Sequence, residues 1–99
     1  RFKRHVARND IPVVVASWAP WCGPCRAMAP VVEQAAQEFE PAARFVKVNV
    51  DAASHLASEF GIQGTPALFM FRNGQIVSRQ AGMMDPISLK RWIAEASRR

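Results

Sequence analysis

Residues 18–26 read Trp-Ala-Pro-Trp-Cys-Gly-Pro-Cys-Arg, and this stretch joins a strand to a helix. Before it, residues 11–18 form a nearly continuous apolar and β-branched run, which is typical of a strand buried on both faces of a sheet. After it, apolar side chains recur at helical spacing up to Phe39. The Gly-Pro pair between the cysteines favours helix initiation, because proline has the backbone angle of the first helical turn. The sequence therefore predicts a strand that ends near residue 18 and a helix that runs to about residue 38, kinked at Pro30.

The remainder of the chain continues this alternation of strands and helices. Asn73-Gly74 is the strongest hairpin signal, because both residues tolerate the positive backbone angles of a tight turn. Asp51 is predicted to cap a short helix that ends at Gly61, and Asp85 to cap the last helix. The order α-β-α-β-α-β-β-α predicts an α/β domain with one mixed central sheet of about four strands and helices on both faces. The predicted strands are residues 11–18, 45–50, 67–72 and 75–81. The predicted helices are the C-terminal end of a helix in residues 1–8, a helix over residues 23–38, a short helix after Asp51, and a last helix that starts at Pro86. The apolar face of the last helix consists of Leu89, Trp92, Ile93 and Ala96.

The composition excludes several classes of protein. The chain has 99 residues, enough for one domain, and the 49 % of hydrophobic and 21 % of charged residues are typical of a packed globular domain. No apolar run is long enough to span a bilayer, so we expect no membrane association. The net charge of +5 comes from the two ends of the chain, since six of the 13 basic residues lie in residues 1–8 and 98–99. The other basic residues nearly balance the acidic ones, and we therefore expect no nucleic-acid-binding surface.

Cys22 and Cys25 are the candidate catalytic residues. Their spacing at the start of a helix places the second sulfur one turn after the first, within bonding distance. The unpaired amides and the positive dipole end of a helix N-terminus favour a thiolate at Cys22, which we expect to be open to a partner. That thiolate would attack a disulfide in another protein, and Cys25 would then attack Cys22, release the reduced partner and leave a Cys22–Cys25 disulfide. The sequence thus predicts thiol–disulfide exchange.

Two inert interpretations of the cysteine pair are weaker. A structural zinc site needs about four ligands, whereas the chain holds no second cysteine pair and its histidines, His5 and His55, are scattered. Cysteines of a packed core are not expected at a junction interrupted by Pro-Trp and Gly-Pro. We expect neither a metal nor a bound cofactor, because residues 61–64 also lack the spacing of a dinucleotide-binding loop.

These motifs resemble those of the thioredoxin family. The specific points are Trp-Cys-Gly-Pro-Cys, the Thr-Pro at residues 65–66, the Asn-Gly turn and Gly82, and the likeness extends from Ile11 onward. The tryptophans around Ala-Pro, Arg26 and the strand at residues 45–50 are most similar to bacterial thioredoxins of the thioredoxin 2 kind, without their zinc-binding N-terminal extension. The resemblance implies a thioredoxin fold and a protein-disulfide reductase that receives electrons from NADPH through a thioredoxin reductase.

The resemblance also implies a substrate groove beside the cysteines. Pro66 matches the family's cis-proline, which leaves the backbone of Thr65 free to pair with an extended substrate segment. Taken alone, Pro66 would be interpreted as an ordinary proline at the start of a strand. Trp21 is expected to provide an apolar contact surface next to Cys22. The residues expected to line the groove are Trp21, Gly23, Pro24, Gly64, Thr65, Pro66, Ala81, Gly82 and Met83.

The sequence departs from the thioredoxin pattern at Ala16 and Ser17, where the family usually has a buried aspartate and an aromatic residue. The resemblance implies that this aspartate accepts a proton from the second cysteine, which alanine cannot do. We therefore expect the second step of exchange to be slower near neutral pH. Lys47 matches the lysine that normally partners the aspartate, so we expect it either to reach water or to lie near the sulfurs as a lone cation.

The beginning of the chain is a second departure. A complete thioredoxin domain has a further strand and a full helix before the strand at residues 11–18. We expect residues 1–99 to be a single domain that is truncated at its N-terminus and belongs to something longer. The missing strand would pair with residues 45–50, so that strand is expected to leave an open sheet edge. We expect a monomer, with an edge-to-edge dimer as the alternative.

Two other functions remain open from the sequence. Thr65 also precedes the proline in oxidising and isomerising relatives, so a disulfide oxidase or isomerase of the same fold is one alternative, although Gly-Pro between the cysteines favours a reductant. The other alternative is a binding or scaffold module in which exchange is incidental. We expect the bacterial cytoplasm rather than the periplasm, because Cys-Gly-Pro-Cys is typical of a reductant and no signal peptide is evident.

Overall fold

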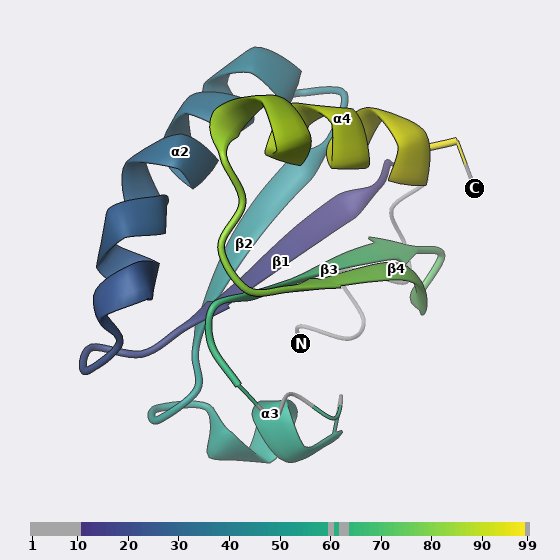
Figure 1. Ribbon diagram of the computed structural model, residues 1–99. Helices are drawn as coiled ribbons and strands as arrows, with labels where there is room; N and C mark the ends of the chain where they lie inside the picture. The colour runs from purple at the N-terminus through teal and green to yellow at the C-terminus, as the bar shows by residue number, and fades with distance from the viewer. Residues whose placement is uncertain (1–10, 60, 62–63, 99) are drawn as a thin grey trace.

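Four strands and three helices make up the part of the chain that the computed structural model describes, residues 11–59, 61 and 64–98. The strands form one sheet in the order β2-β1-β3-β4, with the helices around it (Figure 1). The helix end predicted in residues 1–8 lies outside the described residues. The strands are β1 (Val13–Trp18), β2 (Arg44–Asn49), β3 (Ala67–Arg72) and β4 (Gln75–Ala81), and the helices are α2 (Gly23–Phe39), α3 (Ser54–Glu59) and α4 (Pro86–Ala96).

The sheet is mixed, as the sequence predicts. β1 and β2 are parallel, because α2 carries the chain back along the sheet between them, whereas β3 is antiparallel to both β1 and β4. The turn between β3 and β4 has positive φ at Asn73 (54°) and at Gly74 (79°), the conformation that a two-residue hairpin requires. β3 and β4 begin and end at the residues that the sequence pattern predicts.

β1 is buried on both faces, because apolar clusters lie on either side of it. Val13, Val14 and Val15 are at most 2 % exposed. Val14 packs in the cluster that α2 and α4 share with the sheet, which includes Met28 and Ile93. Val13 and Val15 belong to a second cluster on the other face, as the two-residue period of a strand requires. Figure 1 shows α2 and α4 on one side of the sheet and α3 on the other, so the predicted layering is confirmed.

The short helix α3 begins at Ser54, and the prediction that Asp51 caps it is wrong. The side chain of Asn49, at the end of β2, accepts the N–H groups of Asp51 at 2.9 Å and of Ala52 at 3.3 Å. These bonds form a turn before the helix starts, as an asparagine side chain often does. The carboxylate of Asp51 is therefore available to a neighbouring loop instead of to the helix terminus.

β2 lies at one edge of the sheet. In the described part of the chain it pairs with β1 alone. Its edge is partly satisfied within the chain, since the Phe45 N–H donates to Glu40 Oε2 at 3.4 Å. The predicted open edge depends on the chain before β1, which lies outside the described residues, so it stays a prediction together with the edge-to-edge dimer.

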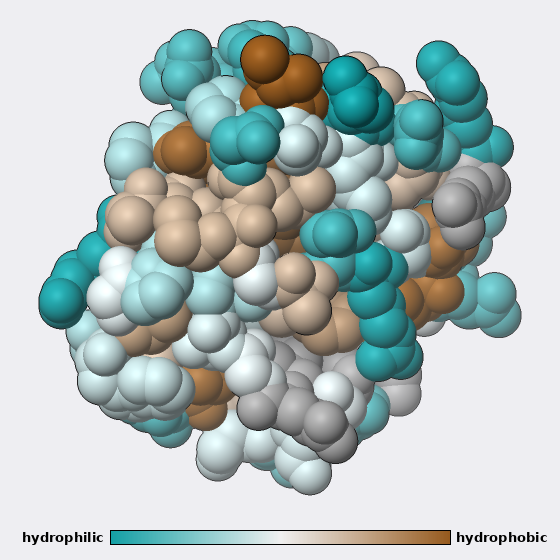
Figure 2. Space-filling model, viewed as in Figure 1, coloured by the Kyte–Doolittle hydropathy of each residue, from teal (hydrophilic) through white to brown (hydrophobic). Residues whose placement is uncertain are grey.

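Polar and apolar side chains both lie on the molecular surface. On the face shown in Figure 2, moderately apolar side chains gather over the upper left and centre, and hydrophilic side chains surround them. Among the residues that the structure describes, three large apolar ones are more than half exposed, namely Trp21, Met83 and Ile87. None of the helices in the described ranges combines the length and the apolar character needed to cross a membrane.

The N-cap of α4 is the one that the sequence predicts. Asp85 Oδ1 accepts the N–H of Ser88 at 2.7 Å, and Pro86 occupies the first helical turn. The backbone N–H of Ser88, followed by a hydrogen bond from the Ser88 side chain, lowers the pKa of Asp85 below its ordinary value. The ionised carboxylate is therefore the form that stabilises the helix terminus.

A pKa lowered by folding gives a contribution to stability that is complete above the unfolded pKa and is lost as the pH falls through the folded pKa. We predict that Asp85→Ala lowers the melting temperature at neutral pH and that the difference shrinks in acid, below about pH 4. Asp85→Asn keeps a capping side chain without a titrating group and should stay close to the unaltered chain at neutral pH. Thermal unfolding followed by circular dichroism measures both. An Asp85→Ala deficit that is independent of pH would contradict this account.

Candidate active site

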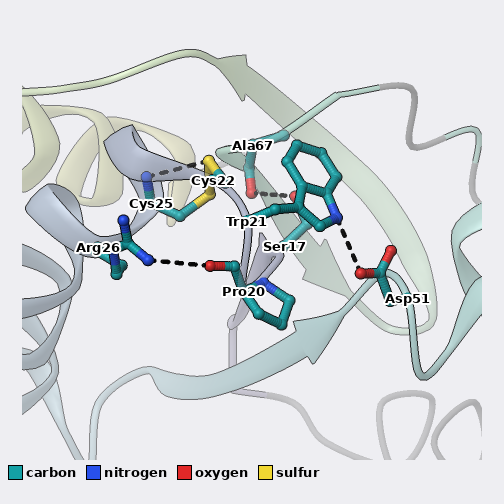
Figure 3. Close-up of a disulfide and its surroundings, with 8 residues drawn as sticks. All are labelled: Ser17, Pro20, Trp21, Cys22, Cys25, Arg26, Asp51 and Ala67. Carbon is teal, nitrogen blue, oxygen red and sulfur yellow. Dashed lines mark hydrogen bonds between the residues drawn. A yellow bond between two sulfur atoms is a disulfide. The ribbon is translucent and has the colours of Figure 1, made fainter.

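The two cysteines lie at the N-terminus of α2 and are joined in a disulfide (Figure 3). Cys22 is the N-cap, and its Sγ accepts the backbone N–H of Cys25 at 3.2 Å. Their Cα atoms are 5.2 Å apart, a separation that the first turn of a helix provides. Pro24 stands in that turn, where its missing N–H removes no helical hydrogen bond. Such a pair exists either as a dithiol or as the disulfide seen here, so it can exchange disulfides with another molecule.

In the disulfide form both cysteines are largely buried, Cys22 being 4 % and Cys25 6 % exposed. The expectation that Cys22 is open to a partner is therefore wrong for the disulfide form of the chain. Trp18, Ala19 and Val50 pack against the pair. The pair reaches the surface beside its exposed neighbours, which are Trp21, Gly23 and Pro24.

Trp21 is held in place although it is 67 % exposed. Its Nε1–H donates to Asp51 Oδ2 at 2.9 Å (Figure 3). The loop after β1 and the turn after β2 lie side by side, because parallel neighbours end at the same edge of a sheet. Sequence reasoning missed this bond between residues 30 positions apart. The sequence nevertheless indicates that the two side chains can meet, because Trp21 and Asp51 each follow one of two strands that are predicted to be neighbours.

Two further hydrogen bonds shape the loop that leads from β1 into α2. The Nη1–H of Arg26 donates to the carbonyl of Pro20 at 3.2 Å (Figure 3). The N–H of Cys22 donates to the carbonyl of Ala19 at 3.1 Å, which closes a tight turn. The loop is thus bonded both to itself and to the first turn of the helix that it starts.

The segment at residues 64–66 lies beside the cysteine pair, since Pro66 and Cys25 line the same cavity. The Thr65–Pro66 peptide bond is cis, and the carbonyl of Pro66 accepts the N–H of Gly82 at 2.9 Å. The Ser17 hydroxyl on β1 donates to the carbonyl of Ala67 at 3.0 Å. These contacts tie the start of β3 both to the end of β4 and to the strand that carries the cysteine loop.

A groove of about 320 Å³ runs over this segment. Thr65 lines this groove, but its Oγ1 is buried away from solvent and has no hydrogen-bond partner among the described residues. Met83 lies outside the lining and is 55 % exposed. Sequence reasoning missed Arg79, a charged lining residue on β4. The lining residues that the sequence did predict are Gly64, Thr65, Pro66, Ala81 and Gly82.

A second cavity, of about 150 Å³, borders Cys25. Most of its lining is apolar, including Ala16, Met28 and Leu68, and no carboxylate of the described residues lines it. A proton that leaves Cys25 on this side therefore meets no acidic side chain from the lining. Across residues 11–59, 61 and 64–98, no cluster of three or more His, Cys, Asp or Glu side chains is suited to a metal ion.

Lys47 also lines this cavity, and its side chain reaches water. Its Nζ lies 3.9 Å from Glu33 Oε2 and 6.0 Å from the centroid of the Trp18 ring. The alternative expectation, a lone cation near the sulfurs, does not hold, because α2 supplies the Glu33 carboxylate. Both partners are more than half exposed, so this ion pair contributes little to stability.

Comparison with known proteins identifies the family. The family model described as thioredoxin matches residues 1–95. The chain is 44 % identical to thioredoxin 1 of Nostoc sp. over 92 residues, which are 93 % of this chain and 86 % of that protein. It is 43 % identical to the thioredoxin of Porphyra purpurea over 89 residues (90 % and 83 %) and 39 % identical to that of Haemophilus influenzae over 92 residues (93 % and 86 %). With the cysteine pair at the N-terminus of α2, these similarities show that the chain belongs to the thioredoxin family of thiol–disulfide oxidoreductases.

Proposed function

We propose that this chain reduces disulfide bonds in other proteins, with Cys22 as the attacking thiolate and Cys25 as the resolving thiol. The observation that carries the proposal is the backbone N–H of Cys25, which points at Cys22 Sγ from the helix N-terminus at 3.2 Å. An N–H donor and the positive end of a helix dipole stabilise an anionic sulfur more than a neutral one. Cys22 is therefore the better placed of the two thiols to begin the exchange.

The exchange consists of two displacements. The Cys22 thiolate attacks one sulfur of the substrate disulfide, the substrate S–S bond breaks, and the departing thiolate takes up a proton from water. Cys25 then loses its proton, attacks Cys22 Sγ and breaks the mixed disulfide, so the second substrate sulfur leaves and is protonated. The pair has delivered two electrons and the proton of Cys25, water has supplied the other proton, and the pair ends as the disulfide present in the structure.

The surface around the pair would bind an extended segment of the substrate. Trp21, anchored on Asp51, offers an exposed apolar face next to Cys22. The backbone of Thr65 would pair with the substrate segment as an added strand does. The residues assigned to this surface are Trp21, Gly23, Pro24, Gly64, Thr65, Pro66, Ala81, Gly82 and Met83.

The disulfide has to be reduced again after each cycle. We propose a thioredoxin reductase, drawing on NADPH, as the source of these electrons. A reducing compartment such as the bacterial cytoplasm suits this cycle, because a dithiol persists there. In this scheme residues 1–99 act as one domain and as a monomer, and the chain itself holds no cofactor other than its own cysteine pair.

The two displacements predict an intermediate that can be trapped. Cys25→Ser removes the resolving thiol, so a mixed disulfide between Cys22 and insulin should accumulate when the variant is mixed with insulin. Non-reducing electrophoresis followed by mass spectrometry identifies the linked residue. The control is the double variant Cys22→Ser, Cys25→Ser. If both variants retained insulin equally, the chain would be a binding module and the reductase proposal would fail.

Cys22 should also be the more reactive thiol of the reduced chain. Iodoacetamide at neutral pH should modify Cys22 faster than it modifies free cysteine, because the Cys25 N–H stabilises the thiolate. Cys25 should react more slowly, since its sulfur lies one turn inside the helix. Peptide mapping by mass spectrometry distinguishes the two sites, and Cys25→Ser reports Cys22 alone. Earlier modification of Cys25 would contradict the assigned roles.

A carboxylate restored beside Cys25 should accelerate the second displacement. Ala16→Asp places an acid in the lining of the cavity that borders Cys25. We expect insulin reduction near neutral pH to rise, by up to about 10² if general-base catalysis is fully effective, and its pH profile to shift. The melting temperature should fall, because a half-buried ionisable group is costly. Ala16→Asn is the matched control, and identical rates and pH profiles for the two variants would show that proton acceptance at this position is not limiting.

A further inference from the structure

We propose that Arg79 selects substrates that carry an acidic side chain close to the disulfide to be reduced. This inference rests on the proposed reductase function and adds a substrate preference to it. Arg79 is exposed on β4 and lines the groove of about 320 Å³ that runs over residues 64–66. Among the described residues it is the one charged side chain in that lining.

The strand register places Arg79 within reach of a bound substrate segment. Arg79 pairs with Phe69 across the sheet, two residues along from the pair that Ala67 forms with Ala81. Side chains two residues apart on a strand share a face and are separated by about 7 Å along it. When an extended substrate segment lies over Pro66, one of its side chains therefore reaches Arg79. That side chain belongs to a residue within about four positions of the substrate cysteine that forms the disulfide.

The guanidinium of Arg79 is held in position without being neutralised. Its Cζ lies 5.5 Å from the centroid of the Phe69 ring, which is the distance of a cation–π contact. Its Nη1 lies 4.0 Å from the position that a Cβ on Gly61 would take, so the guanidinium lies close to Gly61. The aromatic face attracts the cation but occupies none of the in-plane N–H donors.

No acidic group of the chain satisfies this guanidinium in the part that the structure describes. No carboxylate of the described residues lines the groove, and neither the Lys47–Glu33 nor the Lys90–Glu38 ion pair involves Arg79. A guanidinium fork matches the two oxygens of a carboxylate and can bind it through paired N–H···O bonds. The charge that complements Arg79 is therefore an aspartate or glutamate side chain of the substrate.

Matched peptides test the preference. Each peptide carries one cysteine in a mixed disulfide with a chromogenic thiol, and the two members of a pair differ only by Glu or Gln at one position. That position is moved through about four residues on each side of the cysteine. At low ionic strength the unaltered, pre-reduced chain should react with the Glu member at the best position with a second-order rate constant about three- to fivefold higher than with the Gln member. Added salt should reduce this ratio, because the groove is open to solvent.

Variants of the chain assign the preference to one side chain. Arg79→Gln should bring the Glu/Gln ratio close to one, Arg79→Lys should keep part of it, and Arg79→Glu should invert it. Arg98→Gln removes the same charge from an exposed arginine after α4 and should leave the ratio unchanged. Thermal unfolding checks that each variant is folded, and the peptide series on the unaltered chain needs no variant at all.

The outcomes separate the two proposals. A ratio of one at every position in the unaltered chain, or an undiminished ratio in folded Arg79→Gln, overturns the role of Arg79 and leaves the reductase function intact. Failure of the unaltered chain to reduce either member of any pair overturns the reductase function, and the substrate preference with it.

Discussion

The hydrogen bond from the Cys25 N–H to Cys22 Sγ is the contact on which the chemistry of the site depends. It exists because Cys22 is the N-cap of α2, and α2 begins there because β1 ends at Trp18 and Pro24 stands in the first helical turn. The donor belongs to the backbone, so the chemistry of this sulfur is set by where a helix starts. The described lining of the cavity beside Cys25 adds no carboxylate to this arrangement.

The site is assembled from segments that the sheet brings to one edge. β1 and β2 are parallel, and the loop that follows one strand therefore meets the turn that follows the other, as the bond from Trp21 to Asp51 shows. β3 is antiparallel to β1, so it begins where β1 ends and places Pro66 next to Cys25. β4 then returns antiparallel to β3, and the hydrogen bond from Gly82 to Pro66 closes the same edge. Residues that are scattered along the chain become neighbours through strand direction alone.

Local patterns predicted most of the fold, and tertiary contacts decided what they missed. The Asn-Gly turn and its flanking apolar residues located β3 and β4 residue by residue. β1 starts two residues later, and β2 lies one residue earlier, than the patterns indicate, because the pairing of Val13 with Arg44 fixes where the two strands meet. The cap assigned to Asp51 failed, since the side chain of Asn49 takes the nearby N–H groups first.

The candidate site divides in the same way. The cysteine pair and the Thr-Pro segment are contiguous motifs and were recognisable in the sequence. The partners of Trp21 and Lys47, and the presence of Arg79 in the groove, depend on which strands are neighbours and on which way their side chains face. A pattern of single residues carries no such information until the sheet order is known.

The double-sided burial of β1 has a mechanical consequence. Because side chains pack tightly against both faces of β1, the strand has no room to shift or tilt when the disulfide forms or is reduced. The frame that carries both the cysteine loop and Pro66 is thus held from within, by side chains packed on both faces of the sheet.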